Sequence, residues 1–388
     1  MNLTIPEDVL DLMHTLQENG FECYVVGGTI RDMLLDLETH DYDLTTNATP
    51  DEMLSIFSNR KTIPTGIKHG TLTILTNSFP VEITTYRKDS EYLDHRHPSS
   101  VTFSTSLKED CARRDFTINA LCYSEEDGII DFYEGQEDLK KHLIRCIGKA
   151  EERFEEDALR ILRALRFQTQ LDFQIEEDTK KAIFTKKDLL KEISIERIHE
   201  EVSSILNKPC ASLFTEYKEI FMVFLPQIEK INDFSSLDSE GTPLTRMAIL
   251  LKDESDIEKI LDDFKYSNQE ERSILNYINH KDDDLNSRIE IKKCISSIPD
   301  DFYDYIYFRH ALDSSIDIEA MHNIYQEVID NNECISLNQL EINGNDLLEL
   351  GLKGKEISST LQSLLNDVIE DNIPNEKDAL LDKVKASL

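Results

Sequence analysis

The chain has 388 residues, enough for two or more domains with a sizeable core, and its formal net charge is −35. It contains no run of about 18 apolar residues and no basic-then-apolar start, so we expect neither a membrane span nor a secretory signal. The seven cysteines are scattered without a Cys-x-x-Cys pattern. This usage is typical of reduced thiols in a cytoplasmic protein, and not of a disulfide frame or zinc site.

The first predicted elements are a helix, a strand and a glycine turn. Residues 6–19 place apolar side chains at helical spacing, and the apolar stretch 23–26 predicts a strand. Gly27 and Gly28 follow, and two glycines let backbone N–H groups approach a ligand closely. Arg31 adds a cation that suits phosphate. The stretch therefore predicts a phosphate-binding turn.

Asp41 and Asp43 come next, two residues apart in a predicted strand, so both side chains are expected on one face. Two carboxylates beside a phosphate cradle suit Mg²⁺ held between the protein and a nucleotide. A further helix is expected to begin at Thr49-Pro50, with Thr49 as its N-cap.

Residues 70–75 and 81–86 are rich in β-branched residues and predict a hairpin. Glu82 would be a third acidic group near the metals if its strand ran beside the Asp41–Asp43 strand. The alternative is that Glu82 lies on the solvent-exposed face of an edge strand. We favour this alternative because the partner of a strand cannot be predicted from the sequence. Residues 88–97 are charged and aperiodic, which indicates a loop.

Residues 113–120 read Arg-Arg-Asp-Phe-Thr-Ile-Asn-Ala. Arg114 can bind a triphosphate, and Asp115 or Asn119 can contact a sugar. A helix start capped by Asp115 is a second interpretation, and the two are compatible. After a predicted strand at 129–132 and from about residue 138, the apolar spacing becomes helical and remains so.

In the predicted helix 151–168, Asp157 and Arg160 are three residues apart and so expected on one face, with Arg163 beside Arg160 and Arg166 further round. Cytosine and adenine both present an amino donor beside a ring-nitrogen acceptor. An Asp acceptor next to an Arg donor would accept C and A and reject U and G. The alternative is an ordinary surface ion pair, worth about 0.2–0.5 kcal/mol.

Together these motifs resemble the signature of class II tRNA nucleotidyltransferases, the CCA-adding enzymes and their poly(A) polymerase relatives. The matching segments are Gly-Gly-x-x-Arg-Asp at 27–32, Asp-x-Asp at 41–43, Arg-Arg-Asp-Phe-Thr-x-Asn-Ala at 113–120, Glu-Asp-x-x-Arg at 156–160, a further motif at 194–201, and, for the bacterial branch, 341–348 and 374–381. In that family a flexible loop, which 88–97 resembles, helps the site switch from C to A addition.

The resemblance implies an α+β fold with a polymerase-β-type nucleotidyltransferase head, a small mixed sheet with helices, at 1–138. It implies a helical neck for base recognition at 139–207, a helical body at 208–320 and a helical tail that binds tRNA at 321–388. The implied reaction is template-independent addition of C, C and A to the tRNA 3′ end from CTP and ATP, with release of pyrophosphate. Asp41 and Asp43 would hold two Mg²⁺. The implied nucleotide-binding residues are Gly28, Arg31, Arg114, Asp115, Asn119, Asp157, Arg160, Arg163 and Arg166.

Three alternatives are weighed against this function. Within the class, an A-adding tRNA nucleotidyltransferase or a poly(A) polymerase comes next. A second alternative is a catalytically inactive RNA-binding scaffold, which would not need intact Asp41, Asp43 and Arg114. A third is a small-molecule nucleotidyltransferase, which would not need the 156–160 motif. Because the chain is acidic throughout, tRNA binding requires a local basic strip. Its expected members are Lys180, Lys181, Lys186, Lys187 and Lys191.

Overall fold

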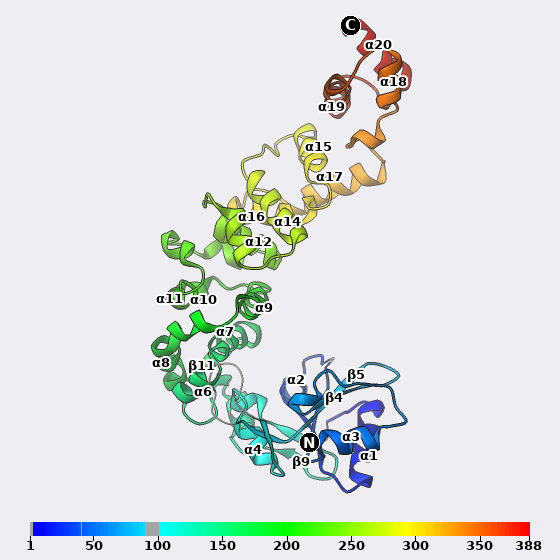
Figure 1. The fold of residues 1–388 in the computed structure, drawn as a ribbon. Helices are drawn as coiled ribbons and strands as arrows, with labels where there is room; N and C mark the ends of the chain where they lie inside the picture. Colours follow the sequence, from blue (N-terminus) through cyan, green and yellow to red (C-terminus); the bar gives the residue numbers. More distant parts are fainter. Residues whose placement is uncertain (1–2, 40, 90–100) are drawn as a thin grey trace. The chain divides into compact units, whose positions relative to one another are not determined.

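The computed structural model describes residues 3–39, 41–89 and 101–388. The chain divides into two compact units, coloured along the sequence in Figure 1. Unit 1 is Met1–Ile205 with Tyr217–Pro226, and unit 2 is Leu206–Glu216 with Gln227–Leu388. The finer division into head, neck, body and tail stays a prediction. Within the described ranges, no helix combines the length and apolar character that a bilayer crossing needs.

A mixed sheet forms the centre of the first part of unit 1. In the described residues it has seven strands, in the order β3-β4-β5-β2-β1-β8-β9. Their bounds are β1 (Cys23–Val26), β2 (Asp43–Thr46), β3 (Thr62–Ile63), β4 (Thr71–Leu75), β5 (Pro80–Thr85), β8 (Cys122–Ser124) and β9 (Gly128–Ile130). Strands β2 and β5 run parallel, and the other neighbours run antiparallel. The predicted hairpin is therefore confirmed as β4–β5.

Strand β5 has one buried face and one exposed face. In β5 the side chains of Val81 and Ile83 are fully buried while Glu82 between them is exposed, the alternation of a half-buried strand.

The helices of unit 1 are α1 (Glu7–Glu18), α2 (Gly28–Leu34), α3 (Pro50–Ile56), α4 (Leu107–Ala112), α5 (Gly135–Lys140), α6 (Ala150–Glu156), α7 (Leu159–Leu171), α8 (Glu177–Lys186), α9 (Ile195–Leu206) and α11 (Lys218–Phe221), with 3₁₀ turns at Ile67–His69, Thr117–Asn119 and Lys187–Glu192.

Local sequence signals set several of these helix starts. The hydroxyl of Thr49 accepts from the backbone N–H of Glu52, whose carboxylate accepts from Thr49 in return, and Pro50 occupies the first position of α3. Such a capping box contributes about 1 kcal/mol. The predicted cap at Thr49 is thus confirmed.

Two secondary-structure predictions for the region after residue 138 are wrong. The expected continuous helix 151–168 is interrupted at Asp157, which has extended backbone angles (φ −144°, ψ 102°) and separates α6 from α7. Its carboxylate accepts from the backbone N–H of Leu159, a local bond that competes with helix continuation. The region after 138 is also not purely helical, because β10 (Leu143–Ile144) pairs in parallel with β11 (Gln174–Ile175).

Unit 2 is helical throughout its described residues. Its helices are α10 (Ala211–Glu216), α12 (Pro243–Leu251), α13 (Ile257–Asp263), α14 (Asn268–Asn279), α15 (Arg288–Ser297), α16 (Phe302–Leu312), α17 (Ile318–Asp330), α18 (Gly344–Glu349), α19 (Lys355–Ile369) and α20 (Lys377–Ser387), with 3₁₀ turns at Pro226–Lys230, Ser235–Asp238 and Leu337–Gln339.

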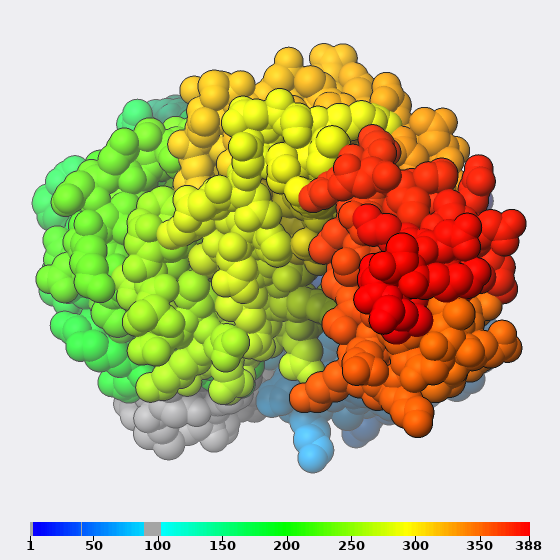
Figure 2. Space-filling model, turned by 90° about the horizontal axis from the view of Figure 1, so that it is seen from above, coloured from blue at the N-terminus to red at the C-terminus, as the bar shows by residue number. Residues whose placement is uncertain are grey.

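Helix α12 is largely buried in unit 2 and contacts both α14 and α16, which lie near it in Figure 1. Its Arg246 is buried and donates to the backbone carbonyls of Leu206, Leu237, Ser239 and Gly241, so the charge is satisfied without a carboxylate. A separate apolar core joins α18, α19 and α20, which form one compact mass of orange and red atoms in Figure 2.

Candidate active site

Three acidic residues lie near one another where strand β2 of unit 1 begins. Strand β2 begins at Asp43, and Asp43 pairs in register with Glu82 on the parallel neighbour β5. Asp41 lies two residues before Asp43, and its backbone carbonyl accepts from the hydroxyl of Thr29 in α2 at 2.6 Å. All three acidic side chains are exposed.

Asp43 is electrostatically coupled to the other two carboxylates and to Arg114. Desolvation by the surrounding protein raises the pKa of Asp43, Arg114 opposes the rise, and the carboxylates of Glu82 and Asp41 add to it. The favoured interpretation of Glu82 as a residue of an edge strand is wrong, since β5 lies between β4 and β2. Carboxylate oxygens are the ligands that Mg²⁺ prefers, so the chemistry of these three residues fits a divalent cation.

The glycine turn brings cations to the same place. Gly27 has φ +85°, a conformation that favours glycine, and a Cβ there would lie 3.4 Å from Nη1 of Arg114. A Cβ at Gly28 would lie 3.2 Å from Nη2 of Arg31. The two glycines thus leave room for guanidinium groups against the backbone as well as for a ligand.

Arg114 is held by a buried carboxylate that sequence reasoning missed. Asp110 in α4 is fully buried and pairs with Arg113 at 2.8 Å and with Arg114 at 3.3 Å. Burial alone would raise the pKa of Asp110, but the two arginines outweigh it and hold the pKa below its usual value. Nothing local in the sequence distinguishes Asp110 from the chain's many other acids.

Asp115 and Asn119 link the head motifs to α7. Oδ1 of Asp115 accepts from the Asn119 amide at 3.1 Å, and Oδ2 accepts from Nε of Arg163 at 2.8 Å. The Asn119 carbonyl oxygen accepts from Nη1 of Arg31 at 2.7 Å, and Arg31 is also paired with Asp32. Burial raises the pKa of Asp115, but Arg163 and Asn119 outweigh it and lower the pKa to about 2.

Phe167 in α7 is surrounded by three arginines. The guanidinium carbons of Arg31, Arg163 and Arg166 lie 4.9, 5.5 and 4.8 Å from its ring centroid. Glu201 in α9 pairs with Arg166 at 3.1 Å and approaches Arg163 at 3.9 Å. Phe167 and Glu201 are therefore two further residues of this region. Phe167 lies in the predicted helix 151–168, and Glu201 belongs to the motif at 194–201.

The motif at 156–160 is arranged differently from the expectation. Asp157 lies outside α7, so it does not share a continuous helix face with Arg160. Its carboxylate instead pairs with Arg197 of α9, at 2.9 Å. Arg160 is buried and donates to Glu156 at 2.7 Å and to the backbone carbonyl of Arg113 at 2.8 Å. The role of these residues in base choice is not tested by this arrangement.

The expected basic strip is largely neutralised. Four of its lysines are paired with carboxylates of the same unit, and Lys180 lies over the ring of Tyr217. The pairs are Lys181 with Asp178, Lys186 with Glu155, Lys187 with Glu219 and Lys191 with Asp188. Exposed pairs of this kind contribute at most about 1 kcal/mol, so an RNA phosphate can displace them. Whether the strip binds tRNA stays a prediction.

The segment 90–97 of the expected loop lies outside the described residues. Its flanks form a two-stranded ribbon, β6 (Arg87–Asp89) with β7 (Val101–Phe103). The aperiodic interpretation was therefore wrong for Lys88 and Asp89, which are part of β6.

Comparisons with known proteins identify the family of this chain. The model of the poly A polymerase head domain matches residues 23–145, that of a probable RNA- and SrmB-binding site of polymerase A matches 172–230, and that of a putative tRNA nucleotidyltransferase domain 2 matches 236–384. A CCA-adding enzyme of Ligilactobacillus salivarius is 36% identical over 99% of this chain and 98% of its own length. One from Staphylococcus haemolyticus is 37% identical over 97% of each chain.

Solved structures give the same result. The CCA-adding enzyme of Bacillus stearothermophilus in complex with CTP superposes with a TM-score of 0.83 and 26% identity, covering 99% of both chains. The Thermotoga maritima CCA-adding enzyme complexed with tRNA, at 21% identity and a TM-score of 0.71 over 99% of this chain and 97% of its own, shares the fold. The chain belongs to the tRNA nucleotidyltransferase/poly(A) polymerase family and, within it, to the CCA-adding enzymes.

Proposed function

We propose that this protein adds C, C and A to the 3′ end of tRNA from CTP and ATP, releasing pyrophosphate at each addition. The observation that carries the proposal is the register of Asp43 with Glu82, which with Asp41 gathers three carboxylates beside Arg114. The names of the full-length relatives and the CTP complex of a similar enzyme support the substrates. Because the substrate is tRNA, we place the reaction in the cytoplasm.

We assign a divalent cation, specifically Mg²⁺, to Asp41 and Asp43, with Glu82 as an added oxygen ligand. Two such ions would lower the pKa of the attacking 3′-hydroxyl and would neutralise the leaving pyrophosphate. The raised pKa of Asp43 supports this assignment, since a cation relieves the repulsion among the three carboxylates.

The remaining head residues would hold the nucleotide. Gly28 and the turn leave space for the triphosphate, and Arg114 and Arg31 would supply its positive partners. Asp110 positions Arg114, and the Asn119 amide positions Arg31 while remaining close to Asp115 for contact with the sugar. No covalent enzyme intermediate is required.

The neck residues would choose the base. Asp157 would accept from the amino group of C or A, with Arg197 fixing the carboxylate, and Arg160 would donate to the ring nitrogen from its position against Glu156. Arg163 and Arg166 would line the same pocket around Phe167. A U or G presents the reverse pattern and leaves polar groups unpaired.

One assay tests the proposal. A tRNA transcript that ends before the CCA is incubated with each nucleoside triphosphate singly and in combination, and a second transcript ending in CC is incubated with ATP. We expect CTP alone to add two C residues, ATP alone to extend only the second transcript, and both together to complete CCA. Extension of only the CC-ending transcript would indicate an A-adding enzyme, and a long A tail would indicate a poly(A) polymerase.

A further inference from the structure

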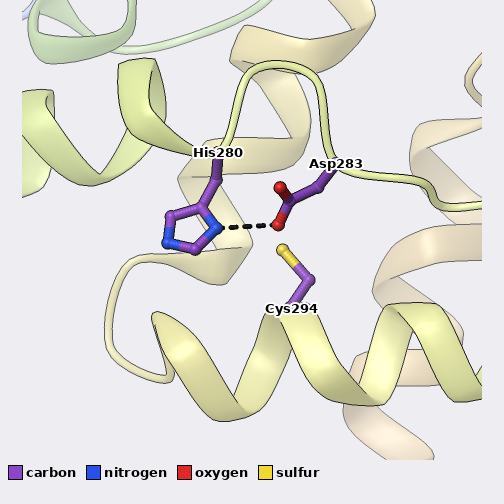
Figure 3. A group of neighbouring side chains, drawn as sticks. All are labelled: His280, Asp283 and Cys294. Carbon is purple, nitrogen blue, oxygen red and sulfur yellow. Dashed lines mark hydrogen bonds and ion pairs between the residues drawn. The ribbon is translucent and has the colours of Figure 1, made fainter.

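Three side chains of metal-binding types converge in unit 2, outside every nucleotidyltransferase motif. His280 follows α14, Asp283 lies in the next loop, and Cys294 lies in the middle of α15 (Figure 3). Nδ1 of His280 is 2.7 Å from Oδ2 of Asp283, and the nitrogen, oxygen and sulfur atoms all lie within 4.8 Å of one another. In Figure 3 the imidazole Nδ1 and the Cys294 sulfur both point toward the Asp283 carboxylate.

From this geometry we propose that His280, Asp283 and Cys294 bind Zn²⁺ and thereby fasten the loop after α14 to α15. A set of one nitrogen, one sulfur and one carboxylate ligand suits Zn²⁺, while Mg²⁺ prefers oxygen alone. With His280 neutral, the Asp283 carboxylate and the Cys294 thiolate balance the double charge of the ion. The fourth tetrahedral position is left to water.

The thiol must lose a proton for this site to form. The Cys294 thiol is buried and lies beside the Asp283 carboxylate (Figure 3). Binding forms the sulfur–zinc bond and releases that proton to solvent, which makes the affinity rise with pH. The sequence spacing of the cysteines predicted no zinc site. The fold brings Cys294 to two ligands that precede it by 14 and 11 positions in the numbering.

A route for the ion exists on the solvent side. The side chains of His280 and Asp283 are 25% and 39% exposed. Asp283 lines an open cavity of about 490 Å³ whose rim also carries Asp282, Asp284, Asp313 and Asp317. This excess of carboxylates attracts a cation.

Among the described residues that line this cavity, Arg309 is the only one with a positive charge, which would repel a cation. Its Nη1 donates to the backbone carbonyls of His280 and Asp283 and to the Tyr305 hydroxyl, so it holds the loop backbone in place. Four further Asp residues around the same cavity outnumber it. The competing interpretation is a purely structural hydrogen-bond cluster that binds no metal.

Cobalt(II) distinguishes the two interpretations, because a cysteine thiolate bound to Co²⁺ gives a near-ultraviolet charge-transfer absorption that oxygen ligands do not. The full chain is titrated with Co²⁺ and then with Zn²⁺ or Mg²⁺. We expect one equivalent of the absorption, its removal by Zn²⁺, and no removal by Mg²⁺. Co²⁺ bound at Asp41 and Asp43 contributes no such band.

Two variants assign the band. Cys294→Ser should abolish it, and Cys334→Ser, a matched change of another buried cysteine in unit 2, should keep it. Asp283→Asn, at a partly exposed loop position, should weaken Co²⁺ affinity by at least about tenfold, since the loss of even an indirect partner of a ligand costs that much. Zn²⁺ should also raise the thermal midpoint of the wild type but not of Cys294→Ser. Absence of the band in the wild type, or its persistence in Cys294→Ser, overturns the proposal.

Discussion

Replacing Asp115 by Asn tests the network that joins the head motifs to α7. The two oxygens of Asp115 each accept two hydrogen bonds: Oδ1 from the backbone of Phe116 and from Asn119, and Oδ2 from Nε and Nη2 of Arg163. An Asn amide has one oxygen and one NH₂ group. Whichever way it turns, its NH₂ faces two donors, so two bonds are lost without a change of side-chain size.

The magnitude follows from the pKa of Asp115. That pKa is about 2 in the folded protein against an ordinary value of 3.8, and the residue is only 7% exposed. A depression of nearly two pH units corresponds to about 2.5 kcal/mol at roughly 1.4 kcal/mol per unit. Unpaired donors add to this, so we expect Asp115→Asn to lower the free energy of unfolding of unit 1 by about 2–4 kcal/mol at pH 7.

The sign of the pH dependence is fixed by the direction of the shift. A carboxyl with a depressed pKa stabilises the folded state fully above its unfolded pKa, near 4, and loses that contribution as the pH falls through about 2. The difference between wild type and Asp115→Asn should therefore be constant from pH 7 to about pH 5 and shrink below pH 4.

Urea unfolding followed by far-ultraviolet circular dichroism at several pH values measures this difference. Asp36→Asn, an exposed carboxyl on a turn with φ +55°, where Asn is tolerated, is the matched control and should change stability by less than about 0.5 kcal/mol. Arg163→Gln completes a double-mutant cycle, and we expect clear non-additivity with Asp115→Asn. A loss no larger than that of the control, or full additivity in the cycle, would refute the reasoning.

Five shorter predictions concern the active site, the basic strip and the segment 90–97. Asp43→Ala should abolish addition of both C and A while tRNA binding, measured by filter retention, stays near wild type; retained turnover with Mg²⁺ would contradict the metal assignment. Asp157→Ala should lower kcat/KM for CTP and ATP and raise the use of UTP and GTP relative to them. The change removes about 1–3 kcal/mol of discrimination between the two pairs of nucleotides. Unchanged ratios of kcat/KM among the four nucleotides would refute the role of Asp157 in base choice. Arg197→Ala should act in the same direction but less strongly, because it removes only the partner that orients the carboxylate. Lys181→Glu should weaken tRNA binding. The affinity of the wild type for tRNA should fall only shallowly with added salt, because salt also screens the repulsion between tRNA and a protein of net charge −35. A steep loss of affinity with salt, together with no effect of the substitution, would argue against the basic strip. Deleting residues 90–97 should leave C addition and stop A addition, and equal loss of both would mark the segment as structural.

The sequence by itself determined the local features of this protein. The helix at 7–18, the strand at 23–26, the capped start of α3 and the β4–β5 hairpin depend on backbone sterics, apolar periodicity and capping within a few residues. The motifs at 27–32, 41–43 and 113–120 were recognisable for the same reason, since each is a short contiguous pattern.

Only the tertiary structure decided which of these pieces meet. Glu82 became part of the acidic cluster because β5 pairs with β2, and strand order is set by the packing of the whole sheet and not by either strand. Asp157 pairs with Arg197, 40 positions away, and Asp115 pairs with Arg163, 48 positions away. In an acidic chain many carboxylates are equivalent in sequence, and burial beside a particular arginine selects which of them hold the site.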